Sequence, residues 1–456
     1  MSEASHPRGT ALRQRAKPPR LATWAAVPAG AALLIWPALL NGYPILFSDT
    51  GGLLAMGFEP SMGWDKPFVY GPLLALLSAH LTLWLPTAAQ AALLSYMLWI
   101  TQALVRPPNP ARHVLLCGIL AAGTAAPWIA STLMPDVFTP IAILGIAALG
   151  LGKQSRAQTV GTAAITAVAI ASHLSHLIVA SACIAAAALL RRTVPWRPLT
   201  SLAAALTFLL VSNAIGHGRP GISPYGSVFA LARLIADGPA RDYLDHACPA
   251  AGYRLCAWRD RLTADSDQFL WDPDSPFWQD PAPLPVFAAE AATIVRETVL
   301  TYPARVLAGG VRNAVRQLGR FQLGDTLVAD YLTEAVLPRL QRWLPADASS
   351  WTRSLQTKGE LPMKAARLAP LHVALLAAGA AACALILASA LRRPNPLADL
   401  TALVLIGLAA NALATGALST VHDRYEARVA WLITLPPLIA LSRSPKNAEA
   451  RAPNPS

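Results

Sequence analysis

The sequence predicts an all-α, polytopic membrane protein, and three observations carry this prediction. Hydrophobic residues make up 54% of the 456 residues and charged residues only 14%, whereas soluble domains hold about 25% charged residues. Apolar runs of about 15–25 residues recur along the chain, and a helix needs about 20 apolar residues to cross a bilayer. Basic residues collect in short segments between these runs, as they do in the cytoplasmic loops of membrane proteins.

The apolar runs predict about ten transmembrane helices. The first run follows a basic tail but is long and lacks a clear small-residue cleavage site, so we expect a retained helix rather than a secretory signal. An even number of crossings places both termini on the same side of the membrane. The expected spans cover residues 21–41, 87–105, 113–131, 135–152, 158–172, 174–190, 197–215, 368–391, 398–418 and 426–441.

The placement of charge predicts the orientation in the membrane. The two tails (1–20 and 443–456) and the four short segments that would lie beside them hold 17 of the 37 basic residues but three of the 25 acidic residues. The long segment 216–367 holds 17 basic and 16 acidic residues. We therefore expect cytoplasmic termini and an extracytoplasmic segment 216–367. The basic pI reflects this orientation and contact with anionic membrane lipids, not binding of nucleic acid.

Two stretches differ from simple spans. Residues 158–190 must cross twice in about 16 residues each, so we expect a thinned or partly re-entrant hairpin. Residues 67–85, in a first outside loop over 42–86, would reverse the charge pattern if they crossed the membrane. Their prolines, glycine and histidine fit an amphipathic helix on the outer membrane surface better.

The segment 216–367 divides the membrane part into a module over 21–215 and C-terminal helices over 368–442. It is long enough for a small, mainly helical domain. Cys248 and Cys256 lie in it with seven residues between them, so we expect a disulfide if the compartment is oxidising. The other three cysteines lie in apolar runs and are interpreted as small hydrophobic residues: Cys117, Cys183 and Cys383.

Ionisable residues gather at the predicted outer ends of the spans. A charged group near the hydrocarbon costs a few kcal/mol, so its default interpretation is functional. Each has a structural alternative: a helix cap for the acid before span four, a headgroup anchor for the arginines, and hydrogen bonding between helices for the histidines. The candidates are Asp49, Asp65, Lys66, Asp136, His173, His176, His422, Arg424 and Arg428.

Other chemistries lack their sequence signatures. The chain contains no Walker loop, no dinucleotide fingerprint, no Cys-x-x-Cys pair and no His-Glu-x-x-His. These patterns hold phosphates, cofactors or metals in pumps and redox enzymes. An ATP-driven pump or a redox enzyme is therefore disfavoured, and no metal ligands are assigned.

Three short motifs follow one another in an order that is typical of one enzyme class. They are Phe-Ser-Asp49-Thr-Gly-Gly, Asp65-Lys66-Pro67-Phe-Val-Tyr70 and Met-Pro-Asp136-Val-Phe. With the 158–190 hairpin they resemble the GT-C superfamily, polytopic glycosyltransferases that use polyprenyl-phosphate sugars. The resemblance covers roughly residues 20–215. The chain departs from the family pattern in the Thr-Gly-Gly, in the single proline after the lysine, and in histidines where the hairpin usually carries a lysine.

The resemblance implies a function and a set of roles. The protein would move a sugar from a polyprenyl-phosphate donor to an envelope lipid, polysaccharide or protein, outside a bacterial inner membrane. Asp49 would act as general base, with Asp136 positioning the base or the acceptor. No cofactor is certain, although a divalent cation is compatible with the family. The donor and its phosphate would be held by Asp65, Lys66, Tyr70, His173, His176, His422, Arg424 and Arg428.

Three other functions stay open at this stage. A transporter or flippase of a lipid-linked or anionic envelope component would use the same cations without chemistry, but predicts a charged site near the middle of the membrane. A membrane acyltransferase or polymer ligase would use His173 or His422 as its base. A non-catalytic envelope scaffold would use segment 216–367 for binding.

Overall fold

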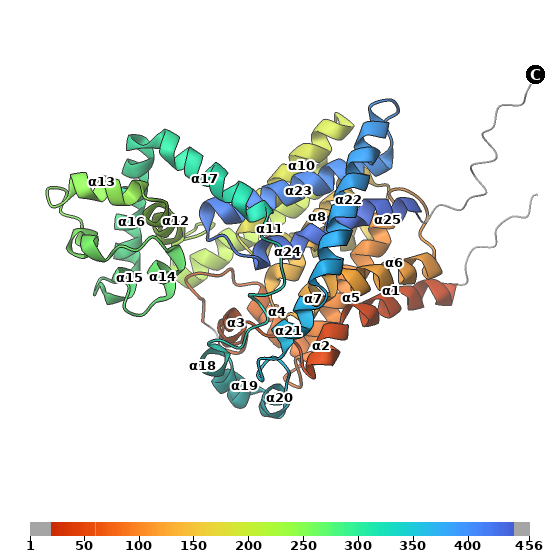
Figure 1. Cartoon of the computed structure of the whole chain (residues 1–456), viewed down its shortest axis with the longest axis horizontal. Helices are drawn as coiled ribbons and strands as arrows, with labels where there is room; N and C mark the ends of the chain where they lie inside the picture. Colours follow the sequence, from red (N-terminus) through yellow and green to blue (C-terminus); the bar gives the residue numbers. More distant parts are fainter. Residues whose placement is uncertain (1–19, 60, 442–456) are drawn as a thin grey trace, which may run out of the picture.

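The structure is a computed structural model, and it describes residues 20–59 and 61–441. Within these residues the chain is helical, and its extended pairing is limited to one bridge between Ile45 and Thr132. The prediction of an all-α fold is therefore confirmed. Figure 1 shows a long helical bundle from which a smaller group of helices projects at the end far from the C-terminus.

The bundle is built around α8 (Phe138–Leu151), in which 12 of 14 residues are buried. A helix that is apolar on all sides belongs in the interior of a bundle, and α8 contacts α5, α9, α10 and α23. The N-terminal helices are α1 (Arg20–Leu34), α2 (Trp36–Asn41), α5 (Trp84–Gln102), α6 (Pro110–Gly123), α7 (Ala126–Ser131), α9 (Arg156–Ala171), α10 (Ser175–Arg191) and α11 (Trp196–His217). The C-terminal elements are α22 (Ala369–Ala390), α23 (Pro396–Leu418), α24 (Arg424–Ala430), the 3₁₀ turn η3 (Trp431–Thr434) and α25 (Leu435–Leu441).

Three helices of the described residues are long and apolar enough to cross a membrane, namely α11, α22 and α23. Several other expected spans are interrupted. The run 21–41 is divided into α1 and α2, and the run 113–131 into α6 and α7. Both second helices carry a proline at their first or second position, where proline starts a helix but cannot continue one. The expectation of about ten crossings stays a prediction.

The loop over residues 42–86 contains two short helices, α3 (Ser48–Phe58) and α4 (Tyr70–Ser78). The sequence predicted one helix over 67–85, but α4 ends at Ser78, and the next residue, Ala79, adopts a left-handed conformation. Nine residues span only about 13 Å, so α4 is too short to cross a bilayer. Helix α3 was not predicted from the sequence, because glycines occupy its first turns.

Segment 216–367 divides into two parts instead of forming one domain. Its first part has a hydrophobic core of its own and is closed by the predicted Cys248–Cys256 disulfide. The elements of this projecting group are α12 (Gly226–Asp237), α13 (Pro239–Ala247), η2 (Arg254–Arg261), α14 (Ser266–Trp271), α15 (Pro276–Gln279) and α16 (Leu284–Thr301).

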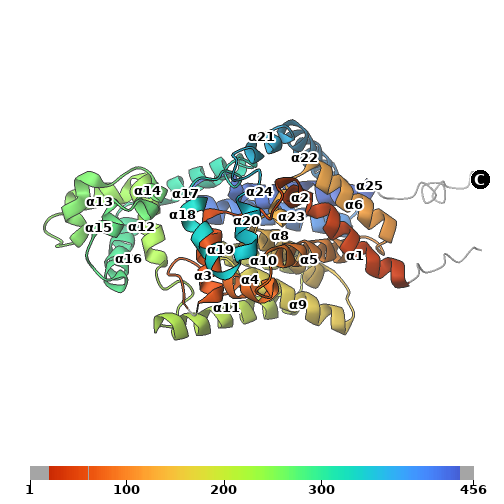
Figure 2. The ribbon, with the colours of Figure 1, turned by 90° about the horizontal axis from the view of Figure 1, so that it is seen from below.

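The second part of the segment belongs to the main bundle. Helix α17 (Pro303–Leu318) packs on α23. Apolar residues of the next helices, such as Leu340 and Trp351, join the core of the bundle. Figure 2 shows the first two of these helices beside α3. The next helices are α18 (Leu332–Ala335), α19 (Leu337–Trp343), α20 (Pro345–Trp351) and α21 (Leu361–Ala366).

Candidate functional site

A cavity of about 320 Å³ lies where the 42–86 loop, the turn between α9 and α10, the C-terminal end of α23, α24 and the projecting group meet. One side of the cavity is polar and carries Asp49, Lys66, His173 and Arg424. The remaining wall is mainly apolar and includes side chains from α10, α12, α14 and α23. The cavity therefore joins a charged region to an apolar region, as a binding site for an amphipathic ligand requires.

Hydrogen bonds between two loops bring Asp49 and Asp136 together. The amide of Ile45 donates to the carbonyl of Ser131, and the amide of Leu133 donates to the carbonyl of Ile45. The hydroxyl of Thr50 donates to the carbonyl of Leu133, 3.1 Å away. These bonds hold the start of α3, which carries Asp49, beside η1 (Pro135–Val137), which carries Asp136.

Asp49 is an accessible carboxylate with a cation on each side. Its side chain is 30% exposed, its Oδ1 lies 3.2 Å from Lys66 Nζ, and its Oδ2 lies 3.6 Å from Arg424 Nη1. Burial alone would raise the pKa of Asp49, but Lys66 and Arg424 outweigh burial and hold this pKa below its usual range. Asp49 is therefore ionised at neutral pH.

Lys66 joins two acids of the 42–86 loop. It contacts Asp65 as well as Asp49. Burial would lower the pKa of the Lys66 ammonium, but these two carboxylates raise it above its usual range. The ammonium also lies over the ring of Trp271, 5.8 Å from its centroid, which connects the loop to the projecting group.

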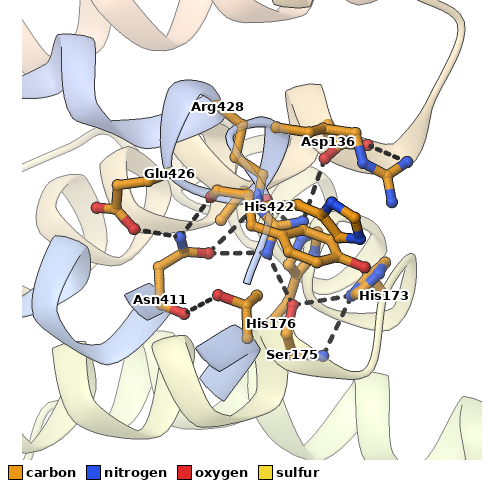
Figure 3. Close-up of polar contacts among 12 residues, drawn as sticks. Asp136, His173, Ser175, His176, Asn411, His422, Glu426 and Arg428 are labelled. Carbon is orange, nitrogen blue, oxygen red and sulfur yellow. Dashed lines mark hydrogen bonds and ion pairs between the residues drawn. The ribbon is translucent and has the colours of Figure 1, made fainter. Parts of the chain in front are cut away.

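Arg428 and Asp136 form a buried pair, and each of the three guanidinium nitrogens of Arg428 donates a hydrogen bond. The side chain of Arg428 is 0% exposed, and its Nη1 donates to Asp136 Oδ1 over 3.3 Å. Its Nη2 donates to Ser175 Oγ over 3.0 Å and to Asn411 Oδ1 over 2.8 Å. Asn411 in turn donates to Glu426, and Figure 3 shows this network. Since a buried charge needs partners on all sides, these bonds fix Arg428 in one orientation.

Arg424 is nearly as buried as Arg428 but is much less bonded. Its side chain is 10% exposed, and its Nη1 lies 3.6 Å from Asp49 and 3.9 Å from Asp136. Neither distance is a hydrogen bond, and Nη1 has no hydrogen-bond partner among the described residues. The guanidinium is held between the rings of Phe47, at 4.4 Å, and Tyr425, at 4.9 Å. Nη1 itself is buried, so Arg424 lines the cavity with a guanidinium whose Nη1 makes ion pairs but no hydrogen bond among the described residues.

His173 has a defined tautomer. Its Nδ1 accepts from the backbone amide of Ser175, 3.2 Å away, and lies 2.8 Å from the Ser175 hydroxyl. An amide can only donate, so Nδ1 is unprotonated and Nε2 carries the proton of the neutral ring. His173 lines the cavity, and Figure 3 shows its contact with Ser175. The ring can therefore offer one N–H donor to a ligand.

Two other predicted site residues lie in the protein interior. His176 is 0% exposed; its Nδ1 donates to the carbonyl of Ala169 and its Nε2 accepts from Thr139. The hydroxyl of Tyr70 donates to Gln90 at 2.9 Å. Neither residue lines the cavity. The contacts of His176 are those of the structural alternative, a histidine that joins two helices.

His422 lies behind the cavity wall and contacts the projecting group. Its Nε2 is 2.7 Å from Asp267 Oδ2, and its backbone exchanges two hydrogen bonds with the side chain of Gln317. The residue therefore holds the loop that leads to Arg424 and does not line the cavity.

Sequence reasoning missed several residues of the site. Asn411 had one available signal, a polar amide in the middle of an apolar run. Trp271 and Asp267 had none, because they lie in a segment whose position relative to the helical bundle cannot be read from local pattern. Gly51 also has a role, since a Cβ there would overlap the carbonyl oxygen of Ala335 in α18. This close approach accounts for a glycine two residues after Asp49.

No group of three or more His, Cys, Asp or Glu side chains within residues 20–59 and 61–441 is arranged to hold a metal ion. Comparisons of the chain with protein families, with curated proteins and with solved structures found no match. The function must therefore be argued from the chemistry of the cavity.

Proposed function

We propose that the protein is a membrane glycosyltransferase that moves a sugar from a polyprenyl-phosphate donor to an extracytoplasmic envelope acceptor. One observation carries the proposal: an ionised and accessible Asp49 shares a cavity with Lys66 and with an Arg424 whose Nη1 has no hydrogen-bond partner. Transfer from a sugar phosphate needs a base for the acceptor hydroxyl and cations for the departing phosphate.

The roles follow from the contacts. Asp49 takes the proton of the acceptor hydroxyl as its oxygen bonds to the anomeric carbon of the sugar. The bond from that carbon to the phosphate oxygen breaks, and the electron pair leaves with the phosphate. Arg424 and Lys66 stabilise the charge that develops there, and His173 donates from Nε2. Asp136 and Arg428 are positioning residues because they are bonded to each other and to the helices.

The two ion pairs of Asp49 favour a mechanism in which binding of the sugar-phosphate donor activates Asp49 as a base. A carboxylate whose pKa is lowered by two cations is a weak base. An anionic phosphate that binds Arg424 and Lys66 competes with Asp49 for these cations and weakens their hold on it. The basicity of Asp49 therefore rises when the donor is bound, which is when a base is needed.

A lipid carrier suits the apolar wall of the cavity. Ile178 of α10 and Ala414 and Leu418 of α23 contribute to this wall, and α23 is one of the helices that can cross a membrane. A prenyl chain that leaves the phosphate region along these helices would remain in an apolar environment, whereas a soluble sugar nucleotide has no such part. This argument favours a lipid phosphate as donor.

We place the protein in the bacterial inner membrane, with cytoplasmic termini and the projecting group outside. The excess of basic residues in the tails and short connections supports this orientation. The Cys248–Cys256 disulfide supports an oxidising compartment for the projecting group.

The decisive experiment measures transfer from a panel of radiolabelled polyprenyl-phosphate sugars by the purified protein in vesicles. Wild type and Asp49→Asn are compared with Asp260→Asn, a matched change at an exposed carboxylate that does not line the cavity. We expect label on the acceptor with wild type and Asp260→Asn, and a loss of about 10²–10⁴-fold with Asp49→Asn. Full activity of Asp49→Asn would remove Asp49 from the base role. Tight binding of the carrier phosphate without transfer from any donor would favour the transporter.

A further inference from the structure

Helix α17 has three different faces, and one is buried against α23. A Cβ added at Gly416 of α23 would lie 2.6 Å from the carbonyl oxygen of Asn313, so the two backbones are in close approach. Gly309, Asn313 and Gln317 are the buried residues of this helix, and the first two also face Asp237 of α12. The α17 helix is thereby fixed to the end of α23 that borders the cavity.

The second face of α17 is apolar and exposed. Leu307 is 69% exposed and Val315 is 64% exposed, and Val311 and Leu318 are exposed as well. These four residues recur at intervals of four, four and three, which places them in one stripe along the helix. Single exposed hydrophobic residues are normal, but a continuous stripe marks a surface that is covered by something.

The third face of α17 is basic. It carries Arg305, Arg312 and Arg316, and residues 303–318 contain no acidic residue. Arg305 and Arg312 are more than half exposed, although each has a carboxylate nearby in the projecting group. A helix with an apolar stripe beside an arginine face is typical of helices that lie in a membrane interface.

We infer that α17 is an interfacial helix, with its apolar stripe among the acyl chains of the outer leaflet and its arginines at anionic lipid headgroups. The occupant is identified by continuity, because α17 rests on α23, one of the three helices that can cross a membrane. Figure 1 shows α17 running from the projecting group to the bundle beside α23. The inference rests on the membrane placement in the proposed function and not on sugar transfer.

The position of α17 also affects the candidate site. The side chain of Gln317, in its last turn, accepts from the amide of His422 and donates to the carbonyl of His422. Asp325, in the loop after α17, accepts from the backbone amide of Arg424 at 3.0 Å. An interfacial α17 therefore sets the depth at which the loop before Arg424 meets the membrane surface.

The test uses spin labels on the full-length protein in vesicles of phosphatidylethanolamine and phosphatidylglycerol. The variants Val311→Cys and Val315→Cys are labelled, and wild type gives the background because its three free thiols are buried. Accessibility to oxygen reports a lipid environment, and accessibility to a water-soluble nickel complex reports solvent. Phe208→Cys on α11 serves as the lipid control, and Val286→Cys on α16 as the solvent control; both parent side chains are exposed.

We expect the α17 labels to resemble the Phe208 label, with a severalfold excess of oxygen over nickel accessibility. Labels that behave like the one at Val286 would overturn the inference, and so would labels reached by neither reagent, since another protein chain would then cover the stripe. A second comparison uses neutral phosphatidylcholine vesicles, in which the labels should lie less deep. Equal depth in both lipids would overturn the assignment of the arginines to anionic headgroups. Neither readout depends on enzymatic activity, so the proposed function can fail independently.

Discussion

Arg424 and Arg428 lie one helical turn apart in α24 and share Asp136, yet their surroundings are opposite. Arg428 is fully buried and donates to Asp136, Ser175 and Asn411. Arg424 borders the cavity, and its Nη1 has no hydrogen-bond partner among the described residues. The charged residues around Asp136 therefore differ in role. Arg428 uses its donors on other protein groups, whereas Arg424 keeps a donor without a hydrogen-bond partner next to the cavity.

This comparison teaches that burial alone does not identify a functional charge. Both guanidiniums are at least nine-tenths buried, and by sequence they were equivalent candidates. What distinguishes them is the number of donors already used. A saturated charge can only hold the protein together, while an unsaturated charge beside a cavity is available to a ligand.

Removal of Arg428 should have the largest effect on stability. Arg428→Gln leaves Asp136 buried without its main partner, which costs about 3–5 kcal/mol. We expect a lower midpoint of thermal unfolding in detergent and a loss of activity that follows the loss of folded protein. The double change Asp136→Asn and Arg428→Gln removes both charges and should recover part of the stability. A double variant as unstable as the single one would contradict the buried-pair account.

Removal of Arg424 should show the opposite pattern. Arg424→Gln takes away a guanidinium whose Nη1 makes no hydrogen bond among the described residues, while Asp136 keeps its bond to Arg428. A hydrogen bond to a charged group is worth about 1.5–3 kcal/mol, so the affinity for polyprenyl phosphate should fall about 10–100-fold. Binding is measured by calorimetry, with Arg296→Gln as an exposed control. A large drop in the unfolding midpoint with unchanged affinity would reverse the roles of the two arginines.

The pH dependence should sharpen the role of Asp49. Its pKa is lowered in the free protein by Lys66 and Arg424 against the effect of burial, so kcat/KM should stay level until the pH falls below the usual carboxyl range. Binding of the phosphate weakens both ion pairs and raises the pKa of Asp49 in the complex. We therefore expect the acid limb of kcat to lie at higher pH than the acid limb of kcat/KM. Coincident limbs would show that the donor leaves the ion pairs of Asp49 intact.

Sequence pattern predicted the helical class and several members of the cavity, because hydrophobic runs and isolated charges are local features. Asp49, Lys66, His173 and Arg424 line the cavity as expected for residues at the same ends of their helices. Pattern could not separate them from His176 or Tyr70, whose partners Thr139 and Gln90 come from other helices. Nor could it place Trp271 or divide segment 216–367, since both depend on contacts between distant parts of the chain.

The smallest expected effect concerns the ring that holds Arg424. Phe47 stacks on the guanidinium at 4.4 Å and is partly exposed; a cation–π contact of this kind is worth about 0.5–2 kcal/mol. Phe47→Leu keeps an apolar side chain but removes the ring, so Arg424 should become less ordered and the affinity for polyprenyl phosphate should fall about 2–30-fold. The same change in an Arg424→Gln background should have almost no further effect, because the group that the ring holds is gone. Additive losses in the double variant would mean that Phe47 contacts the ligand directly. The ligand-binding residues would then include Phe47, before α3, as well as Arg424 in α24.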